Sequence, residues 1–268
     1  MKKLVFAICV LPYLALWFAQ EGKTRWNDLY LSPAPPAAVL QVASGYAQQM
    51  AGFALFVKVA IFQGGTQRGI DKLSYADNMA QNFAVMTALY PEFKDAFIYC
   101  QSFLAPIAPE YAERTNIILE RAVRQHPDDF LFPFYQGFNL FYYMDKPVEA
   151  GKTFYEAAQY PDAPAWFGSL AGKLMGRGGN LTAGRNMLQA MYAAEQNESV
   201  KQRYLRSIEN FDRAIEVQHA LDEYRADTGA DAENLKDLVP QYVDALPQLH
   251  DGYVLNWNPP VLKLEHSR

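Results

Sequence analysis

A proline motif recurs through the middle of the chain: Tyr90-Pro91-Glu92, His126-Pro127-Asp128 and Tyr160-Pro161-Asp162. The prolines lie 36 and 34 residues apart, and each follows a stretch whose apolar residues are spaced as in a helix. A period of about 34 residues closed by a proline is typical of helix-turn-helix repeats. Because one helix pair cannot bury its apolar face alone, such pairs stack on their neighbours. The period therefore predicts an all-α solenoid of antiparallel helix pairs.

Three segments carry a small residue, a large apolar residue four positions later, and an alanine three positions beyond that. The triplets are Thr115, Leu119 and Ala122; Ala150, Phe154 and Ala157; and Ala183, Met187 and Ala190. Steps of four and three place each triplet on one face of a helix, where small residues let a neighbouring helix approach closely. We expect these nine residues to be the positions at which the repeats pack.

The triplets resemble the second helix of tetratricopeptide repeats, over residues 65–195. Gly137 matches the small position of the first helix, whereas the Trp and Leu expected upstream of it are absent. Helices of about a dozen residues fit this repeat better than armadillo or HEAT repeats, which remain alternatives. The resemblance implies a repeat domain over residues 37–198 with about four helix pairs, a surface for binding other proteins, and no catalytic role or cofactor.

One predicted first helix, residues 130–144, is unusually aromatic, with more rings than one packed face needs. First helices line the concave groove of tetratricopeptide solenoids, and aromatic side chains are frequent binding anchors. The candidate anchors for a bound peptide are Tyr135, Phe138, Tyr142 and Tyr143. The alternative is that these rings are buried against the first long helix of the array, because aromatic side chains dominate protein cores.

The N-terminus predicts an export signal. Lys2 and Lys3 precede an uncharged run over residues 4–19, which is the layout of a basic region followed by an apolar core. No small-x-small cleavage pattern follows, so we expect residues 1–20 to remain as a membrane anchor, with a cleaved signal peptide as the alternative. The lysines favour a cytoplasmic N-terminus, which places the body of the chain in the periplasm of a bacterium.

A proline-rich linker, residues 21–36, connects the anchor to the repeat domain. The next stretch, residues 37–62, is strongly apolar and has two interpretations: a second membrane span, or the first helix of the solenoid buried by its neighbours. Several Gln residues and Lys58 interrupt the run, and a charge at membrane depth is costly. We therefore expect a buried helix.

The C-terminal quarter differs from the repeats. Residues 199–227 predict one long helix whose apolar stripe caps the last repeat. In residues 228–268, two short apolar runs at 253–255 and 261–264 predict a β-hairpin. This tail resembles the C-terminal region of type II secretion pseudopilins, although their turn motif is replaced at residues 248–252. The resemblance implies a role in assembling a pilus or a secretion machine.

Composition argues against several other classes of function. The net charge is -5 and no Lys/Arg stripe is present, so we expect no nucleic-acid partner. The only cysteines are Cys9 and Cys100, and the four histidines lack metal-ligand spacing, so we expect no metal site. The Gly-Arg-Gly-Gly segment at residues 176–179 lacks the Lys-Ser/Thr ending of a phosphate loop and indicates the end of a helix.

Together these features predict a non-catalytic protein–protein interaction scaffold of the bacterial cell envelope, whose partners are other envelope proteins or peptide segments. The alternative is a periplasmic enzyme or ligand-binding protein with a helical site of an unfamiliar kind. An open groove favours the scaffold. A closed apolar cavity with converging His or carboxylate groups favours the alternative.

Overall fold

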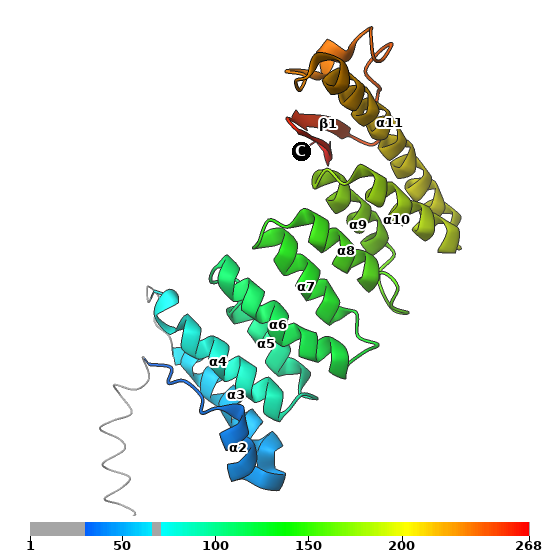
Figure 1. Ribbon diagram of the computed structural model, residues 1–268. Coiled ribbons are helices and arrows are strands. Elements are labelled where there is room, and N and C mark those ends of the chain that lie inside the picture. Colours follow the sequence, from blue (N-terminus) through cyan, green and yellow to red (C-terminus); the bar gives the residue numbers. More distant parts are fainter. Residues whose placement is uncertain (1–29, 66–70, 268) are drawn as a thin grey trace, which may run out of the picture. The chain divides into compact units, whose positions relative to one another are not determined.

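The computed structural model describes residues 30–65 and 71–267, which divide into two compact units (Figure 1). Unit 1 ends at Gln125 and unit 2 begins at His126. The described residues are mostly helical, with a two-stranded sheet near the C-terminus. The predicted helical fold with a short β-containing tail is therefore confirmed. The predicted anchor at residues 4–19 lies outside the described residues.

Unit 1 consists of short and medium helices that pack on one another. They are α2 (Ala37–Ser44), a 3-10 turn (Gly45–Ala47), α3 (Gln48–Gly65), α4 (Leu73–Leu89), α5 (Lys94–Phe103) and α6 (Pro109–Gln125). The single helix expected over residues 37–62 is interrupted, because Gly45 adopts a φ of 50° that ends α2. α4 packs against α3, α5 and α6, and its Phe83 and Met86 are buried together with Phe97 of α5.

The end of the predicted linker belongs to unit 1. Residues 30–36 have no regular secondary structure, yet Leu31 is buried. The backbone oxygen of Ser32 accepts hydrogen bonds from Lys58 Nζ (2.6 Å) and Asn82 Nδ2 (2.9 Å). Partial burial lowers the pKa of the Lys58 side chain. This part of the chain is therefore packed on α3 and α4, not a free spacer.

α2 and α3 are only partly buried. The buried residues of α3 are Gly52, Val59 and Phe62, and α2 has none. A series of large apolar side chains is exposed: Val39, Val42, Tyr46, Met50, Phe53, Val57 and Ile61. Neighbouring helices were expected to bury residues 37–62. This is wrong for the face of α3 that points away from α4, because α4 covers only the opposite face. No helix among the described residues is both long and apolar enough to cross a bilayer.

In unit 2 each helix packs mainly against the next one in the sequence (Figure 1). The helices are α7 (Leu131–Tyr142), α8 (Pro147–Ala157), α9 (Trp166–Arg177), α10 (Leu181–Ala194) and α11 (Glu198–Thr228). α11 begins where Asn197 Oδ1 accepts hydrogen bonds from the backbone of Ser199 and Val200, and it ends at Gly229, whose φ is 74°. The long helix expected at residues 199–227 is therefore present.

A 3-10 turn (Leu235–Leu238) and a β-hairpin complete unit 2. The strands β1 (Tyr253–Asn258) and β2 (Val261–His266) pair antiparallel, as predicted, and β2 packs on α9 and α11. A Cβ at Gly176 would lie 2.9 Å from the backbone oxygen of Leu264, and a Cβ at Gly179 would lie 2.5 Å from Val261 Cγ1. The glycines that end α9 therefore also let β2 approach it.

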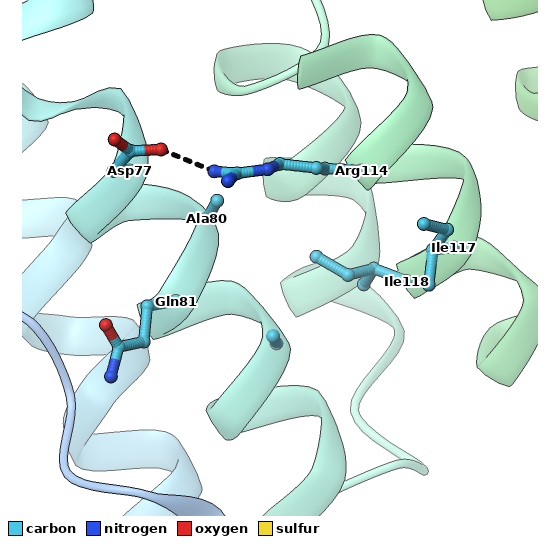
Figure 2. A pocket seen from close by; sticks show the side chains of 7 residues that line it. Asp77, Ala80, Gln81, Arg114, Ile117 and Ile118 are labelled. Carbon is cyan, nitrogen blue, oxygen red and sulfur yellow. Dashed lines mark hydrogen bonds and ion pairs between the residues drawn. The ribbon is translucent and has the colours of Figure 1, made fainter. Parts of the chain in front are cut away.

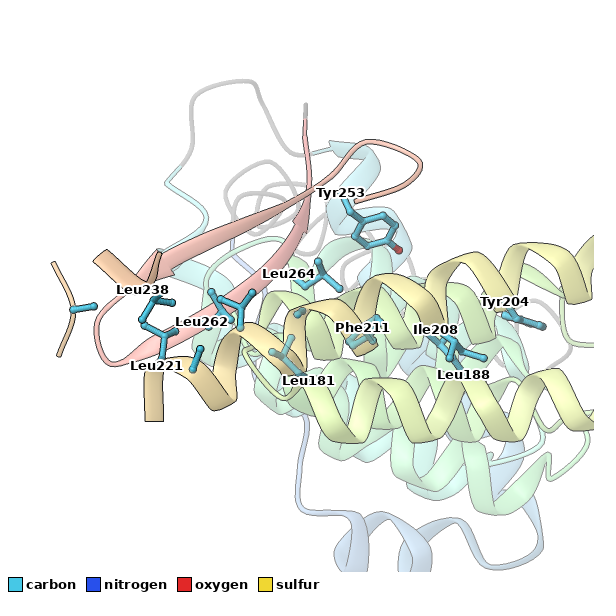
Figure 3. Packing of buried hydrophobic residues seen from close by; sticks show 14 of the residues in the cluster. Leu181, Leu188, Tyr204, Ile208, Phe211, Leu221, Leu238, Tyr253, Leu262 and Leu264 are labelled. Atoms are coloured by element: carbon cyan, nitrogen blue, oxygen red, sulfur yellow. The ribbon is translucent and has the colours of Figure 1, made fainter. Parts of the chain in front are cut away.

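The hairpin shares one apolar core with α10 and α11. Figure 3 shows Leu181 of α10 and Phe211 of α11 in the same cluster as Leu262 and Leu264 of β2. All four side chains are buried. This packing holds the hairpin against the last two helices and gives its side chains defined positions beside α9.

Candidate functional site

Two cavities of about 440 Å³ and 530 Å³ open on unit 2 between α9 and the hairpin; α11 bounds the first of them, and Phe141 of α7 bounds the second. Leu170, Lys173, Tyr253 and His266 line both of them. Because the cavities share these walls, we treat them as one site and call it the unit 2 groove. Its other lining residues include Trp166, Ser169, Arg203, Arg206, Ser207 and Asp251 in the first cavity, and Phe141, Leu174, Arg177, Val254, Leu264 and Glu265 in the second.

α9 supplies one wall of the groove. Trp166, Leu170, Lys173 and Arg177 follow one another at steps of three and four, so they lie on one face of the helix. Trp166 is 49% exposed, and Lys173 and Arg177 are exposed at the surface. This face therefore offers apolar and cationic side chains side by side to solvent.

α11 supplies the opposite wall of the first cavity, with Arg203 and Arg206. The Nε of Arg206 pairs with a carboxylate oxygen of Asp251 at 3.0 Å, which ties the start of the hairpin to α11. The hydroxyl of Tyr204 donates a hydrogen bond to the backbone oxygen of Ala165 at 2.9 Å, next to the start of α9. These contacts fix the spacing of the two walls.

The hairpin supplies the third side. Tyr253 is buried, and Lys173 Nζ lies 6.0 Å from the centre of its ring. Burial raises the pKa of Tyr253. The hydrogen bond with Ser207 lowers this pKa, and the negative charge of Asp251 raises it, so the pKa lies above its usual value. The Tyr253 phenol therefore remains protonated at neutral pH. The ring of His266 lies 5.5 Å from that of Tyr253, centre to centre.

The charges in the groove do not balance. Arg206 is paired with Asp251, and the other acid, Glu265, accepts a hydrogen bond from the neutral amide of Asn256 at 3.1 Å and keeps its negative charge. The three remaining Lys and Arg side chains are Lys173, Arg177 and Arg203. Within residues 30–65 and 71–267, none of these three has a carboxylate at ion-pair distance. The groove is thus locally cationic on a chain whose net charge is -5.

The four aromatic residues predicted as anchors, on α7 and directly after it, line neither cavity of the groove. Tyr142 is 66% exposed; its ring stacks on Phe138 at 5.2 Å and meets Tyr143 edge-on at 5.0 Å. Tyr135 is half-buried, and burial raises its pKa and that of Tyr143. The α7 residue that does line a cavity is Phe141, with the Arg177 guanidinium 5.1 Å from its ring centre.

The first two predicted packing triplets are buried: Thr115, Leu119, Ala122, Ala150, Phe154 and Ala157. On α10, in contrast, Ala183 and Met187 are half-exposed and Ala190 is exposed, whereas Gly184 and Leu188 are buried. The packing face of α10 therefore lies one residue later than the sequence predicts.

The physical reason for this shift is the close contact between α10 and α11. A Cβ at Gly184 would lie 2.5 Å from Cε1 of Phe211, so this position accepts only glycine without rearrangement. On the other side, Leu188 fills the space left by the missing side chain of Gly172. A search for alanine at the small position selects Ala183 and misses Gly184.

A further cavity, of about 420 Å³, lies in unit 1 between α4 and α6 (Figure 2). Its two charged residues, Asp77 and Arg114, form an ion pair with each other. Its other walls are small or apolar, apart from Gln81, whose amide donates a hydrogen bond to the backbone oxygen of Ala34. The polar groups of this cavity are therefore already paired, unlike the cations of the unit 2 groove.

Metal-binding or nucleophilic groups are not gathered at either site. No group of three or more His, Cys, Asp or Glu residues suited to a metal ion occurs among the described residues. Cys100 is buried, its Sγ lies 3.9 Å from Thr115 Oγ1, and burial raises its pKa to about 12. The thiol is therefore protonated at neutral pH and acts as a small packing group.

The chain matches no protein-family model, no curated protein and no solved structure. Its function is therefore inferred from the shape and chemistry of the unit 2 groove.

Proposed function

We propose that the helix pairs form a tetratricopeptide-like solenoid. The sequence period supports this proposal, as does the packing of α7, α8, α9, α10 and α11 each against the next. Glycines on α7 and α9 have equivalent contacts: a Cβ at Gly137 would lie 3.0 Å from Phe154 Cδ2, and a Cβ at Gly172 would lie 2.7 Å from Leu188 Cγ. The partners are 17 and 16 residues further along the chain, as expected for successive copies of one repeat.

The function that the groove supports best is binding an extended segment of another protein, without catalysis. One observation carries this proposal: Trp166, Lys173 and Arg203 line an open groove, and no carboxylate of the described chain pairs with either cation. Exposed aromatic rings next to cations are the side chains most often found at binding hot spots.

The proposed setting is the bacterial envelope, where the chain assists assembly of a pilus or a secretion machine from a membrane-attached position. The export signal predicted at residues 4–19 and the resemblance of the tail to pseudopilins support this setting. The exposed apolar series on α2 and α3 also supports it, since an apolar patch of this kind marks a contact with a membrane or another protein.

The test is recovery of partners from detergent-solubilised membranes with the full chain as bait. Trp166→Ala removes the exposed ring of the groove, and Tyr192→Ala is the matched control, because Tyr192 on α10 is also partly exposed and lines neither cavity. We expect an envelope assembly component with the unmodified chain and the control, and much less with Trp166→Ala. Recovery of no such component, or equal recovery with all three, would contradict the proposal.

A further inference from the structure

The unpaired cations of the unit 2 groove indicate the charge of its partner. Lys173 and Arg203 reach the first cavity from α9 and α11, and Arg177 reaches the second. These three exposed cations repel one another, and Glu265, the one carboxylate of the groove without an ion-pair partner among the described residues, offsets only one of the three charges. A bound anion relieves this repulsion and gains charge-assisted hydrogen bonds.

The apolar walls indicate that the partner is not a small anion alone. Trp166 and Leu170 precede Lys173 on the same face of α9, and Phe141 lies beside Arg177. The cavities, about 440 Å³ and 530 Å³, together exceed the volume that one carboxylate or phosphate group fills. An extended peptide can contact both the cationic and the apolar side chains of the groove, because acidic and apolar side chains can alternate along it.

We propose that the unit 2 groove binds an acidic, extended segment of a partner protein. Carboxylates of the segment pair with Lys173 and Arg203, and an apolar side chain between them rests on Trp166 and Leu170. The hairpin takes part, because Tyr253 and His266 line both cavities. This inference rests on the proposed peptide-binding function and adds the chemistry of the ligand.

The experiment uses the full chain in detergent and three pools of fluorescein-labelled nine-residue peptides with identical apolar residues. The remaining positions are Asp/Glu in the first pool, Asn/Gln in the second and Lys/Arg in the third. Fluorescence polarisation then gives an apparent Kd for each pool. We expect the acidic pool to bind at least about tenfold more tightly than the neutral pool, and this gap to shrink in 0.5 M NaCl because salt screens exposed charges.

Charge reversal assigns the effect to the groove. Lys173→Glu should weaken acidic-pool binding about tenfold or more and strengthen binding of the Lys/Arg pool. Lys173 is exposed and has no ion-pair partner among the described residues, so this variant should fold normally, which circular dichroism checks. Lys152→Glu is the control, because Lys152 is an exposed residue of α8 that lines neither cavity and undergoes the same change of charge.

Each result decides the inference. Equal binding of the three pools would overturn the acidic ligand while leaving peptide binding itself intact. Binding of no pool would overturn both the inference and the proposed function. Concentration-dependent self-association that Lys173→Glu abolishes, without peptide binding, would identify a second copy of this chain as the occupant and would also overturn the inference. Equal loss in Lys173→Glu and Lys152→Glu would show that net charge, not the groove, attracts the peptide.

Discussion

The contact between Gly172 and Leu188 allows the repeat packing of unit 2 to be tested by a double-mutant cycle. A Cβ at Gly172 would lie 2.7, 2.8 and 2.9 Å from the three outer carbons of Leu188, all too close for an unstrained contact. Leu188 is 1% exposed. The side chain of Leu188 therefore occupies the space that Gly172 leaves free. The double variant should lose less stability than the sum of the losses of the two single variants.

The magnitudes follow from this geometry. Leu188→Ala leaves a cavity in the core and should lower the free energy of unfolding by about 3 kcal/mol. Gly172→Ala forces Leu188 away at a cost of about 2 kcal/mol, and the better helix propensity of alanine offsets about 1 kcal/mol of this. If the two changes acted independently, the double variant would lose about 4 kcal/mol.

In the double variant the methyl group introduced by Gly172→Ala enters the space vacated by the leucine side chain. The loss should then be about 2 kcal/mol, which is a coupling of about 2 kcal/mol between the two sites. The chain also contains Trp17 and Trp26, so urea unfolding is followed by fluorescence in a Trp17→Phe/Trp26→Phe background, in which the remaining Trp166 and Trp257 both lie in unit 2 and report on it. Gly64→Ala is a control in unit 1, where nothing lies within 4 Å of the new methyl group, so it should leave the unfolding of unit 2 unchanged. Additive losses, or stabilisation by Gly172→Ala alone, would refute the assigned packing.

Three further predictions concern unit 1. Thr87→Val should lower the free energy of unfolding by about 1–3 kcal/mol, because half-buried Arg121 donates a 2.7 Å hydrogen bond to the Thr87 hydroxyl; urea titration of Thr87→Ser, which retains the hydroxyl, is the comparison. Stability should fall as pH rises above about 9, by up to about 1.4 kcal/mol per pH unit, because the unfolded Cys100 thiol ionises while burial raises the folded pKa to about 12; a slope unchanged in Cys100→Ala would contradict this. Val42→Asp, at a residue that is 87% exposed, should leave the melting temperature unchanged and ease extraction from membranes by mild detergent, whereas Val59→Asp, at a buried residue, should unfold unit 1.

The helices and the hairpin were largely predictable because their signals are local. The triplet Ala183, Met187 and Ala190 indicated a helix, which is α10 (Leu181–Ala194), and the two apolar runs around Pro259 and Pro260 form the strands of the hairpin. The interruption at Gly45 was missed, since one glycine inside an apolar run is compatible with a continuous helix. The packing register of α10 was missed because it depends on contacts with Phe211 of another helix.

The candidate site was predictable only in part. An aromatic segment on α7 is visible in the sequence and does border the groove, yet none of the four chosen residues lines a cavity. The lining residues Lys173, Arg203 and Tyr253 come from α9, α11 and the hairpin, and no local spacing relates them. The one available signal was the spacing of three and four residues that joins Trp166 to Lys173 and Arg177. This spacing indicates a binding surface only when the exposed face of α9 is known.

Site-specific photocross-linking tests the central claim most directly, namely that the unit 2 groove holds a segment of another protein. A photoreactive phenylalanine derivative replaces Trp166 in the groove or, as the control, Tyr192 on α10, and the full chain is irradiated in the membranes of cells that contain it. Mass spectrometry then identifies the attached peptide. The account predicts a discrete adduct at position 166, joined to a segment rich in Asp and Glu, and none at position 192. Adducts only at position 192, or none at position 166, would contradict it.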